Sequence, residues 1–427
     1  MKIVATTDRG FRTTVKHVCE RASSQNRQVE KTVKTILDGV ARGGDAAVVR
    51  YVKRFDGIRL KPMAFQVPSE EIKQSHAHIR KEEGDALRYA AHSIRSFHES
   101  QRTATWFKQE KGIRLGQLIT PLDAVGVYVP GGKALYPSSV LMNIIPAKVA
   151  GVKRVVMCTP TTTGTIDPYL LVAADIAQVD EVYRVGGVQA IGAMAFGTET
   201  IPRVDKIVGP GNQYVATAKR LVYGQVDIDM IAGPSELLVL ADDTANVAHV
   251  ASDLLCEAEH DEEARVYLVT TSARLAKAVA AEMQSQLSTL QRKKIASKSV
   301  SRYAVGFVVP DMDTAIDLSN AIAPEHLEIM VKHALDYLNR IRHAGAVFVG
   351  PHTPPSVADY VAGPNHVLPT GGSARFFSAL SLDDFIKRTN VVCYNKEDLR
   401  LAKSYVTQLA RMEGLEAHAK SIESRFP

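Results

Sequence analysis

Short apolar runs alternate with helix-like segments along the chain from about residue 120 onward. A first set of runs typical of buried strands covers residues 124–129, 154–158, 181–185 and 205–208, and a second set covers 236–240, 265–269, 303–309, 327–331 and 346–349. This alternation is typical of parallel sheets with helices on both faces. The sequence therefore predicts an α/β protein with two tandem Rossmann-like parallel-sheet domains.

Helical patterns flank these two sets of strands. Residues 29–51 and 69–100 carry apolar positions three and four residues apart, with an interruption at Gly43-Gly44. A helical tail is expected from about Asp383. Residues 350–380 are rich in Gly, Pro, Ser and Thr, and an ordered loop of this length is often functional.

Composition narrows the class of protein. The 427 residues exceed the usual size of one hydrophobic core, and 45% hydrophobic with 23% charged residues is ordinary for a soluble globular protein. The net charge of +6 comes from well-mixed charges, so nucleic acid is not an expected partner. The sequence has neither an apolar run of about 18 residues nor a signal-peptide pattern at its N-terminus. We therefore expect a cytoplasmic protein without a membrane association.

Polar residues that follow strands are the first candidates for chemistry. A doubly wound enzyme usually works beyond the carboxyl ends of its strands. Four polar stretches meet that expectation: residues 231–236, 257–260 and 323–328, and the long loop with Asp359, Asn365 and His366.

Glu257 and His260 stand three residues apart near the end of an expected helix, so they share one face. This geometry suits two ligands of one metal ion, although such a pair is more often a solvated surface contact. Asp359 and His418 would complete an N/O ligand set of the kind that zinc accepts. The four cysteines lie far apart without a CxxC pair, so neither a disulfide framework nor a thiolate zinc site is expected.

Two further stretches are ambiguous on spacing alone. Glu325-His326 offers two groups that move protons near neutral pH, but a helix-end pair that bonds local backbone is an equal reading. The turn Gly209-Pro-Gly211 suits a phosphate at a helix N-terminus, but Tyr214 stands where a dinucleotide motif has its third glycine. The pattern alone thus predicts a multi-domain α/β enzyme and leaves its metal dependence open.

Nearly the whole chain resembles histidinol dehydrogenase. The matching segments are Val125-Gly-Val-Tyr-Val-Pro-Gly-Gly132, Tyr136-Pro-Ser-Ser-Val-Leu-Met142, Val185-Gly-Gly-Val-Gln-Ala190, Ala195-Phe-Gly-Thr198, Val208-Gly-Pro-Gly-Asn212, Ala232-Gly-Pro-Ser-Glu236, Ala258-Glu-His260, Ala323-Pro-Glu-His-Leu327 and Asn365-His-Val-Leu-Pro-Thr370. Many distinctive segments in the order of the family make the match specific.

The resemblance implies an activity, cofactors and an assembly. The family oxidises L-histidinol to L-histidine in two NAD-dependent steps, with one zinc ion per active site, as a domain-swapped homodimer. It implies an N-terminal helical arm over 1–24, a first α/β domain over 25–124 and 237–381, a second inserted at 125–236, and a helical tail over 382–427 that is exchanged between subunits.

The resemblance also implies roles for individual residues. Glu325 matches the position that activates water, and His326 matches the general acid/base. Glu257, His260, Asp359 and His418 match the zinc ligands, and Tyr128, Gln189 and Asn212 match NAD contacts. The substrate-contacting positions are Ser235, Glu257, His260, His326, Asp359, His366, Glu413 and His418.

One position departs from the family pattern. The family usually has Gln at the first zinc-ligand position, where this chain has Glu257. A carboxylate is a competent ligand, but it lowers the charge of the site by one unit. A paralogue that oxidises another polar alcohol, such as a sulfonated diol, is therefore an alternative. A catalytically inactive relative with a binding role is a further hypothesis, which the retained Glu325-His326 pair disfavours.

Overall fold

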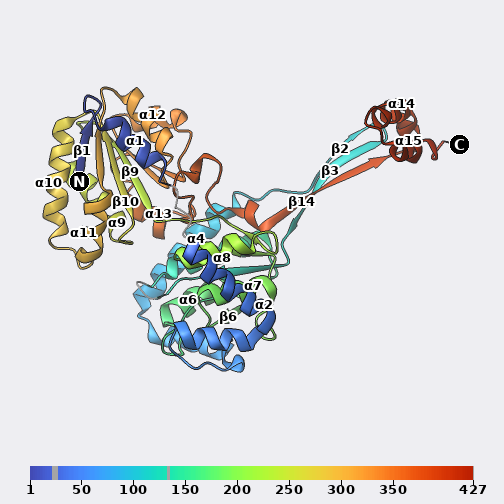
Figure 1. Ribbon diagram of the computed structural model, residues 1–427, viewed down its shortest axis with the longest axis horizontal. Coiled ribbons are helices and arrows are strands. Elements are labelled where there is room, and N and C mark those ends of the chain that lie inside the picture. The colour runs from blue at the N-terminus through green and yellow to red at the C-terminus, as the bar shows by residue number, and fades with distance from the viewer. Residues whose placement is uncertain (22–26, 132–134, 427) are drawn as a thin grey trace. The chain divides into compact units, whose positions relative to one another are not determined.

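The computed structural model describes residues 1–21, 27–131 and 135–426, and the chain forms two compact units (Figure 1). The first unit comprises Met1–Gln101 and Leu122–Phe385, and the second comprises Arg102–Pro121 and Ile386–Pro427. Gly132, the last residue of the first family segment, lies outside the described residues, as does part of the arm expected over 1–24. Within the described ranges, no helix combines the length and apolar character that crossing a membrane requires.

A six-stranded parallel sheet forms one half of the first unit. Its strands, in spatial order, are β1 (Lys2–Ala5), β11 (Val305–Val308), β10 (Arg265–Thr270), β9 (Glu236–Ala241), β12 (His326–Met330) and β13 (Ala346–Val349). Its helices are α1 (Phe11–Cys19), α9 (Val247–Ala258), α10 (Ala273–Leu287), α11 (Lys293–Tyr303), α12 (Met312–Ile322) and α13 (Pro355–Tyr360). Leu237 and Val239 of β9 pack toward α9 and α10, whereas Leu238 and Leu240 pack toward α12 on the other face. Because both faces are covered, the central strands of this sheet are largely apolar on both faces.

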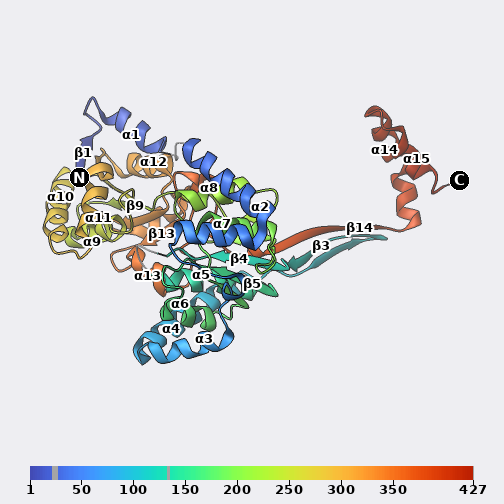
Figure 2. The same ribbon diagram turned by 60° about the horizontal axis from the view of Figure 1, so that its bottom comes forward.

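A five-stranded parallel sheet forms the other half. Its strands, in spatial order, are β6 (Glu181–Tyr183), β5 (Arg154–Cys158), β4 (Ala124–Tyr128), β7 (Lys206–Val208) and β8 (Asp227–Ile228). The helices α4 (Lys81–Glu99), α5 (Pro137–Ala150) and α6 (Pro168–Ile176) cover one face, and α2 (Arg27–Phe55), α7 (Gly187–Phe196) and α8 (Gln213–Val222) cover the other (Figure 2). Two α/β sheet layers are thus present, as the sequence predicts.

The N-terminal third of the chain packs differently from the sequence-based grouping. The helices α2, α3 (Ser69–Gln74) and α4 lie against the five-stranded sheet and its helices, whereas the family resemblance implies that residues 25–124 form one domain with 237–381. α2 consists of two helical stretches that meet at a kink at Gly44, whose φ of 46° is not helical, so the interruption expected at Gly43-Gly44 is confirmed. β1 pairs with β11 and adds an edge strand that no local pattern predicted. The domain boundaries themselves stay a prediction.

The second unit contains a three-stranded antiparallel sheet and two helices. β14 (Ile386–Tyr394) pairs with β3 (Ile113–Pro121) over nine residue pairs, and β3 pairs with β2 (Trp106–Glu110). The expected helices follow as α14 (Lys396–Met412) and α15 (Glu416–Glu423). The sequence did not predict these strands, because their side chains are mostly exposed and lack an apolar face.

The remaining regular segments are short. They are the 3₁₀ helices η1 (Pro62–Ala64), η2 (Ser75–His78), η3 (Ala334–Arg340), η4 (Ser373–Arg375) and η5 (Leu382–Phe385).

Candidate active site

The candidate acid–base residues lie where the strands of the six-stranded sheet begin. His326 is the first residue of β12 and pairs with Leu237, the second residue of β9. Glu257 lies near the end of α9, the helix that runs back from the far end of β9. The expectation that these residues sit beyond the carboxyl ends of the strands is therefore wrong for this sheet. The helices that connect the strands, such as α9 and α12, run antiparallel to the strands, so their C-terminal ends lie at the edge of the sheet where the strands begin.

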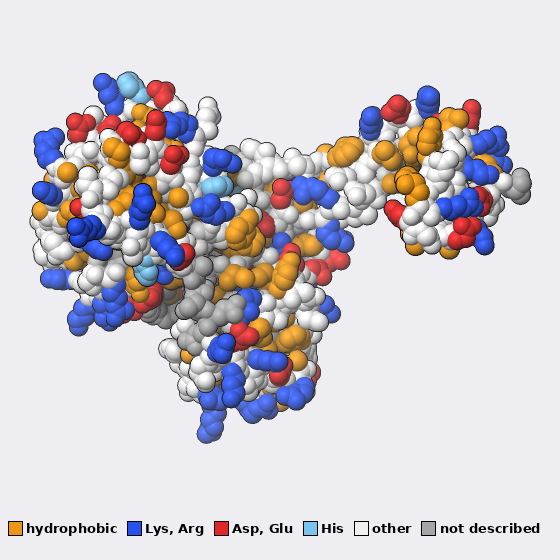
Figure 3. Space-filling model, turned by 45° about the horizontal axis from the view of Figure 1, so that its top comes forward, with side chains coloured by type: hydrophobic (Ala, Val, Ile, Leu, Met, Phe, Trp, Pro, Cys, Tyr) orange, Lys and Arg blue, Asp and Glu red, His pale blue; other side chains and the backbone are white. Residues whose placement is uncertain are grey.

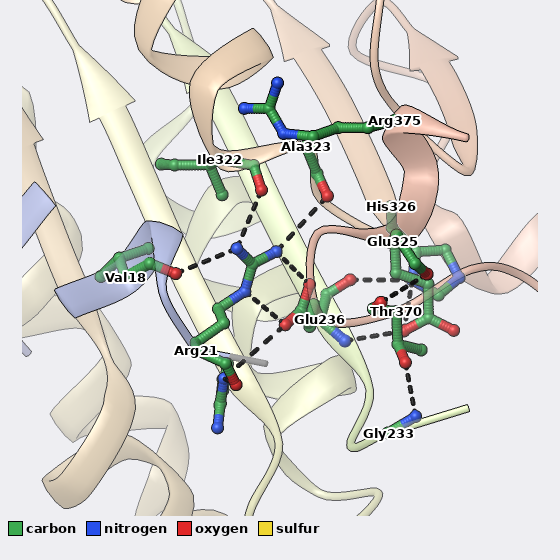
Figure 4. Close-up of polar contacts among 12 residues, drawn as sticks. Val18, Arg21, Gly233, Glu236, Ile322, Ala323, Glu325, His326, Thr370 and Arg375 are labelled. Atoms are coloured by element: carbon green, nitrogen blue, oxygen red, sulfur yellow. Dashed lines mark hydrogen bonds and ion pairs between the residues drawn. The ribbon is translucent and has the colours of Figure 1, made fainter. Parts of the chain in front are cut away.

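The backbone of Glu236 holds both Glu325 and His326. Its N–H donates to Glu325 Oε2 at 2.8 Å, and its carbonyl oxygen lies 3.0 Å from His326 Nδ1 (Figure 4). A carbonyl oxygen can only accept, so Nδ1 carries the hydrogen and the neutral ring keeps its lone pair on Nε2. The ring is buried and stacks on Phe348, with centroids 5.7 Å apart. His326 is thus fixed as a proton acceptor through Nε2.

Two buried carboxylates flank this imidazole. Glu257 Oε2 lies 3.4 Å from His326 Nδ1, and Glu325 Oε2 lies 3.7 Å from the same atom. Burial raises the pKa of Glu325 well above its usual value, and the negative charge of Glu257 raises it further. A carboxyl group with a raised pKa at a buried site is typical of a group that exchanges protons near neutral pH.

Glu257 and His260 are in direct contact, as their spacing predicts. His260 Nδ1 lies 3.0 Å from Glu257 Oε1. Burial would raise the pKa of Glu257, but the positive charge of His260 and the hydrogen bonds from His260 and Ser235 act in the opposite direction and hold that pKa below its usual value. The Glu257 charge in turn raises the pKa of His260 to about 9. Glu257 is therefore ionised beside His260, and an ionised carboxylate next to an imidazole favours a bound cation once the His260 proton has left.

The long loop after β13 forms the wall of a cavity next to His326. The cavity has a volume of about 380 Å³, and its lining includes His326, Phe348, Asp359, Asn365 and His366. His366 Nδ1 lies 3.0 Å from the Asp359 carbonyl oxygen, and His366 Nε2 lies 3.3 Å from the Ser139 hydroxyl. Burial lowers the pKa of His366, so its ring is held neutral. The wall belongs to the loop over residues 350–380, whose length led to the expectation that it is functional.

The three candidate nucleotide contacts lie at the carboxyl edge of the five-stranded sheet. Tyr128 ends β4, and its hydroxyl accepts a hydrogen bond from the Gly187 N–H at 3.1 Å. Gln189 lies in the first turn of α7 and is buried, and its Nε2 has no hydrogen-bond partner among the described residues. Asn212 caps α8 through bonds to the Tyr214 and Val215 N–H groups.

The turn after β7 approaches the end of β4 closely. A Cβ atom on Gly209 would lie 2.1 Å from the Tyr128 carbonyl oxygen, and the φ of Gly209 is 111°, so no other residue fits this turn. The backbone near Asn212 therefore lies beside Tyr128, at the kind of sheet edge where doubly wound proteins bind nucleotides.

The last two candidate site residues belong to the second unit. Glu413 follows the end of α14, and His418 lies in α15. Both are exposed. The described part of the first unit brings together Ser235, Glu257, His260, Glu325 and His326, with Asp359 and His366 on the adjoining cavity.

Comparison with known proteins identifies the family. The family model described as histidinol dehydrogenase matches residues 19–426. The chain belongs to the histidinol dehydrogenase family. It is 51% identical over 427 residues to the histidinol dehydrogenase of Bacillus thuringiensis subsp. konkukian, covering 100% of this chain and 99% of that protein. It is 50% identical over 428 residues to that of Syntrophotalea carbinolica, again covering 100% and 99%.

A solved structure agrees with this assignment. The crystal structure of histidinol dehydrogenase from Elizabethkingia anophelis matches with a TM-score of 0.94 and 37% identity, covering 100% of this chain and 98% of that one. The resemblance noted in the sequence is thereby confirmed, and so are the α/β fold and the oxidoreductase class. Membership of the histidinol dehydrogenase family places the enzyme in histidine biosynthesis.

The donor atoms of this family member fit a divalent cation. Ligand atoms of Glu257, Glu325 and His326 all lie within 4.8 Å of one another. His326 Nδ1 already bonds the Glu236 carbonyl, however, so the Glu257–His260 pair is the better start of a ligand set. Oxygen and imidazole nitrogen donors of this kind suit zinc.

Sequence reasoning missed two buried charged residues near this site, Arg21 and Glu328. Arg21 forms a buried ion pair with Glu236, and Glu328 lies buried two residues beyond His326. No sequence signal marks Arg21, because its partner lies 215 residues away. The Leu327-Glu328-Ile329 alternation gives a weak signal for Glu328, since a carboxylate in an otherwise apolar strand is unusual.

Replacing Glu328 with glutamine is expected to flatten the pH dependence of stability. Burial, and then the Asp253 charge, raise the pKa of Glu328 from 4.5 to about 9. The folded state therefore keeps a proton that the unfolded chain releases above pH 4.5. This contribution is fully present below that pH and is lost as the pH rises toward 9, at up to about 1.4 kcal/mol per pH unit.

Urea unfolding at pH 5, 6.5 and 8 checks this effect. The unfolding free energy of the wild type should fall more steeply with pH than that of Glu328→Gln. Parallel pH profiles for the two proteins would show that Glu328 ionises normally in the folded state.

Proposed function

We propose that this enzyme oxidises L-histidinol to L-histidine through L-histidinal, with NAD as hydride acceptor and one zinc ion per active site. The observation that carries the proposal is the Glu236 backbone, whose N–H donates to Glu325 and whose carbonyl accepts the hydrogen bond from His326 Nδ1–H, beside the Glu257–His260 pair. Family membership supplies the substrate class.

Glu257, His260 and Asp359 are proposed as zinc ligands, and His418 as the fourth. The direct Glu257–His260 contact supports the first two, and the Asp359 charge also raises the pKa of His260. When bound, zinc polarises and fixes its ligand groups at the reacting centre. The pKa of His260 is raised to about 9, and its proton must leave for this ligand to bind, so we expect zinc binding to weaken as the pH falls below about 9.

His326 is proposed to move the hydroxyl proton. Hydride transfer from an alcohol leaves a proton that a base must take, and the neutral ring offers Nε2 for this purpose. The ring lines the cavity, and its stacking on Phe348 limits its rotation. Because Nδ1–H stays bonded to the Glu236 carbonyl, the ring that gains a proton on Nε2 remains oriented.

Glu325 is proposed to activate the water of the second step. An aldehyde must be hydrated before a second hydride leaves, and hydration requires a base next to water. One Glu325 oxygen bonds the Glu236 N–H, which fixes the carboxyl group. The Glu257 charge raises the pKa of Glu325, so a cation bound by Glu257 favours the ionised form that the base requires.

The remaining residues are proposed to bind substrate and cofactor. Ser235 and His366 would contact substrate, together with Glu413 and His418, and the neutral ring of His366 borders the cavity. Tyr128, Gln189 and Asn212 would contact NAD. The unpartnered Nε2 of buried Gln189 supports that role, because a buried amide donor without a partner is costly unless a ligand accepts its hydrogen bond.

A homodimer with shared active sites is proposed as the working assembly. Leu401, Tyr405, Leu409 and Met412 project from successive turns of α14, and each is more than half exposed. Hydrophobic side chains gather on this unit in Figure 3. An apolar helix face of this kind needs a cover, and we propose a second copy of the chain, whose own tail would be exchanged in return.

Glu257 supports one alternative. A carboxylate in place of the usual Gln changes the charge of the proposed metal site, as expected for a relative that oxidises another polar alcohol such as a sulfonated diol. The buried contacts of Glu257 with His260 and His326 show that the carboxylate is integrated into the site.

Turnover of L-histidinol tests the proposal. Purified enzyme with zinc and NAD should form about two NADH for each L-histidine, one per hydride. Removing zinc with a chelator should abolish turnover, and adding zinc back should restore it. A sulfonated diol assayed in parallel is the control for specificity. Brisk oxidation of the diol without oxidation of histidinol would overturn the substrate assignment.

A further inference from the structure

The residue that holds both reacting groups is itself held by a buried arginine. Arg21 Nε donates to Glu236 Oε1 and Arg21 Nη2 donates to Glu236 Oε2, both at 2.5 Å. The exposed fractions of the two side chains are 3% and 1%. A two-point contact between a planar guanidinium and a carboxylate fixes orientation as well as distance.

The remaining N–H groups of Arg21 bind the segment that leads to Glu325. Nη1 donates to the Val18 and Ile322 carbonyl oxygens at 3.0 and 2.8 Å, and Nη2 donates to the Ala323 carbonyl at 3.4 Å (Figure 4). An arginine side chain has five N–H donors, so these bonds and the two to Glu236 use all of them.

Two of the bound carbonyls, those of Ile322 and Ala323, lie at a constrained turn. Ala323 follows the end of α12 in the left-handed conformation, with a φ of 50°, which is unusual for a residue other than glycine. Pro324 comes next, and Glu325 and His326 follow. The Glu236 backbone forms hydrogen bonds with Glu325 and His326, and the turn at 322–323 leads directly into these two residues. Arg21 binds both Glu236 and this turn, so it fixes the distance between the two backbone segments that position Glu325 and His326.

We propose that Arg21, through its ion pair with Glu236, is a positioning residue for Glu325 and His326. The inference rests on the proposed function, because it requires these two residues to be the reacting groups. Buried ion pairs contribute little net stability against apolar replacements, so stability alone is a weak explanation for this one. A shift of about 1 Å in a reacting group lowers rates roughly a hundredfold, so a device that fixes two such groups has a large kinetic effect.

Arg21→Lys tests the proposal. Lysine keeps the charge, but its single nitrogen cannot span both Glu236 oxygens and the carbonyls of the turn. We expect kcat to fall about 10- to 100-fold, with KM for L-histidinol within about twofold of wild type and zinc content unchanged.

Arg184→Lys is the matched control. Arg184 is also buried and donates to the Ala64 and Gln66 carbonyls and to Glu71, on the side of the five-stranded sheet. Its replacement should lower the melting temperature about as much as Arg21→Lys while leaving kcat at saturating NAD unchanged. An equal kcat loss in both variants would show a general packing effect and overturn the positioning role.

Glu236→Gln is a second, milder variant in case Arg21→Lys does not fold. It keeps the backbone bonds to Glu325 and His326 but weakens the grip of Arg21, and kcat should again fall with KM preserved. A kcat within about twofold of wild type would overturn the inference. The wild type is assayed first: if it oxidises histidinol and the variants match it, only the positioning role fails, whereas an inactive wild type refutes the proposed function.

Discussion

Glu325→Gln is expected to lower the rate of L-histidinal oxidation about 10²- to 10⁴-fold, the usual contribution of a general base. Glutamine has the shape of glutamate, and its amide oxygen can still accept the Glu236 N–H bond. It cannot take a proton from water, so hydration of the aldehyde should fail. Alcohol oxidation should lose much less, because that step needs a proton acceptor at His326 and no water.

Separate assays of the two half-reactions measure this difference. NADH formed from supplied L-histidinal reports the second step, and the first NADH formed from L-histidinol in a single turnover reports the first. Glu328→Gln is the matched control, since it makes the same change at a buried carboxyl three residues along the chain, within β12. Equal losses in both half-reactions of Glu325→Gln would contradict a role confined to hydration.

The strands of the two parallel sheets could be predicted because both faces of each sheet are covered. The run over 154–158 coincides with β5, and the run over 346–349 coincides with β13. The second unit lacks this signal. β14 is stabilised by pairing with β3, more than 260 residues away in the chain, and its mostly exposed side chains follow no apolar alternation. Such pairing is a tertiary effect that local pattern does not encode.

The candidate site was predictable in part for similar reasons. The three-residue spacing of Glu257 and His260 predicts their contact, because it is set by helix geometry alone. Their approach to His326 depends on how α9 returns to the amino edge of the sheet, which spacing does not reveal. The contact between Arg21 and Glu236 is even less predictable, because two residues that lie 215 positions apart have no local sequence pattern in common.

Mixed dimers of Glu325→Gln and His418→Asn are expected to regain the complete oxidation of L-histidinol to L-histidine, which neither variant carries out alone. Glu325 lies in the first unit and His418 in the second, and we propose that each site takes His418 from the partner subunit. In a heterodimer, one site then carries both substitutions and the other carries neither. Random mixing of equal amounts makes half of the dimers heterodimers, so activity should approach about a quarter of the wild-type value.

Each single variant, refolded alone by the same procedure, gives the baseline activity. Differently tagged subunits allow the heterodimer to be purified. Purified heterodimer should have about half of the wild-type activity, with one competent site of two. Its zinc content should likewise lie near one tightly bound ion per dimer, since asparagine removes a ligand from the other site. If each site were built within one chain, every site would carry one substitution, and mixing would restore nothing. The experiment therefore separates exchange of the tail from simple dimerisation through the apolar face of α14.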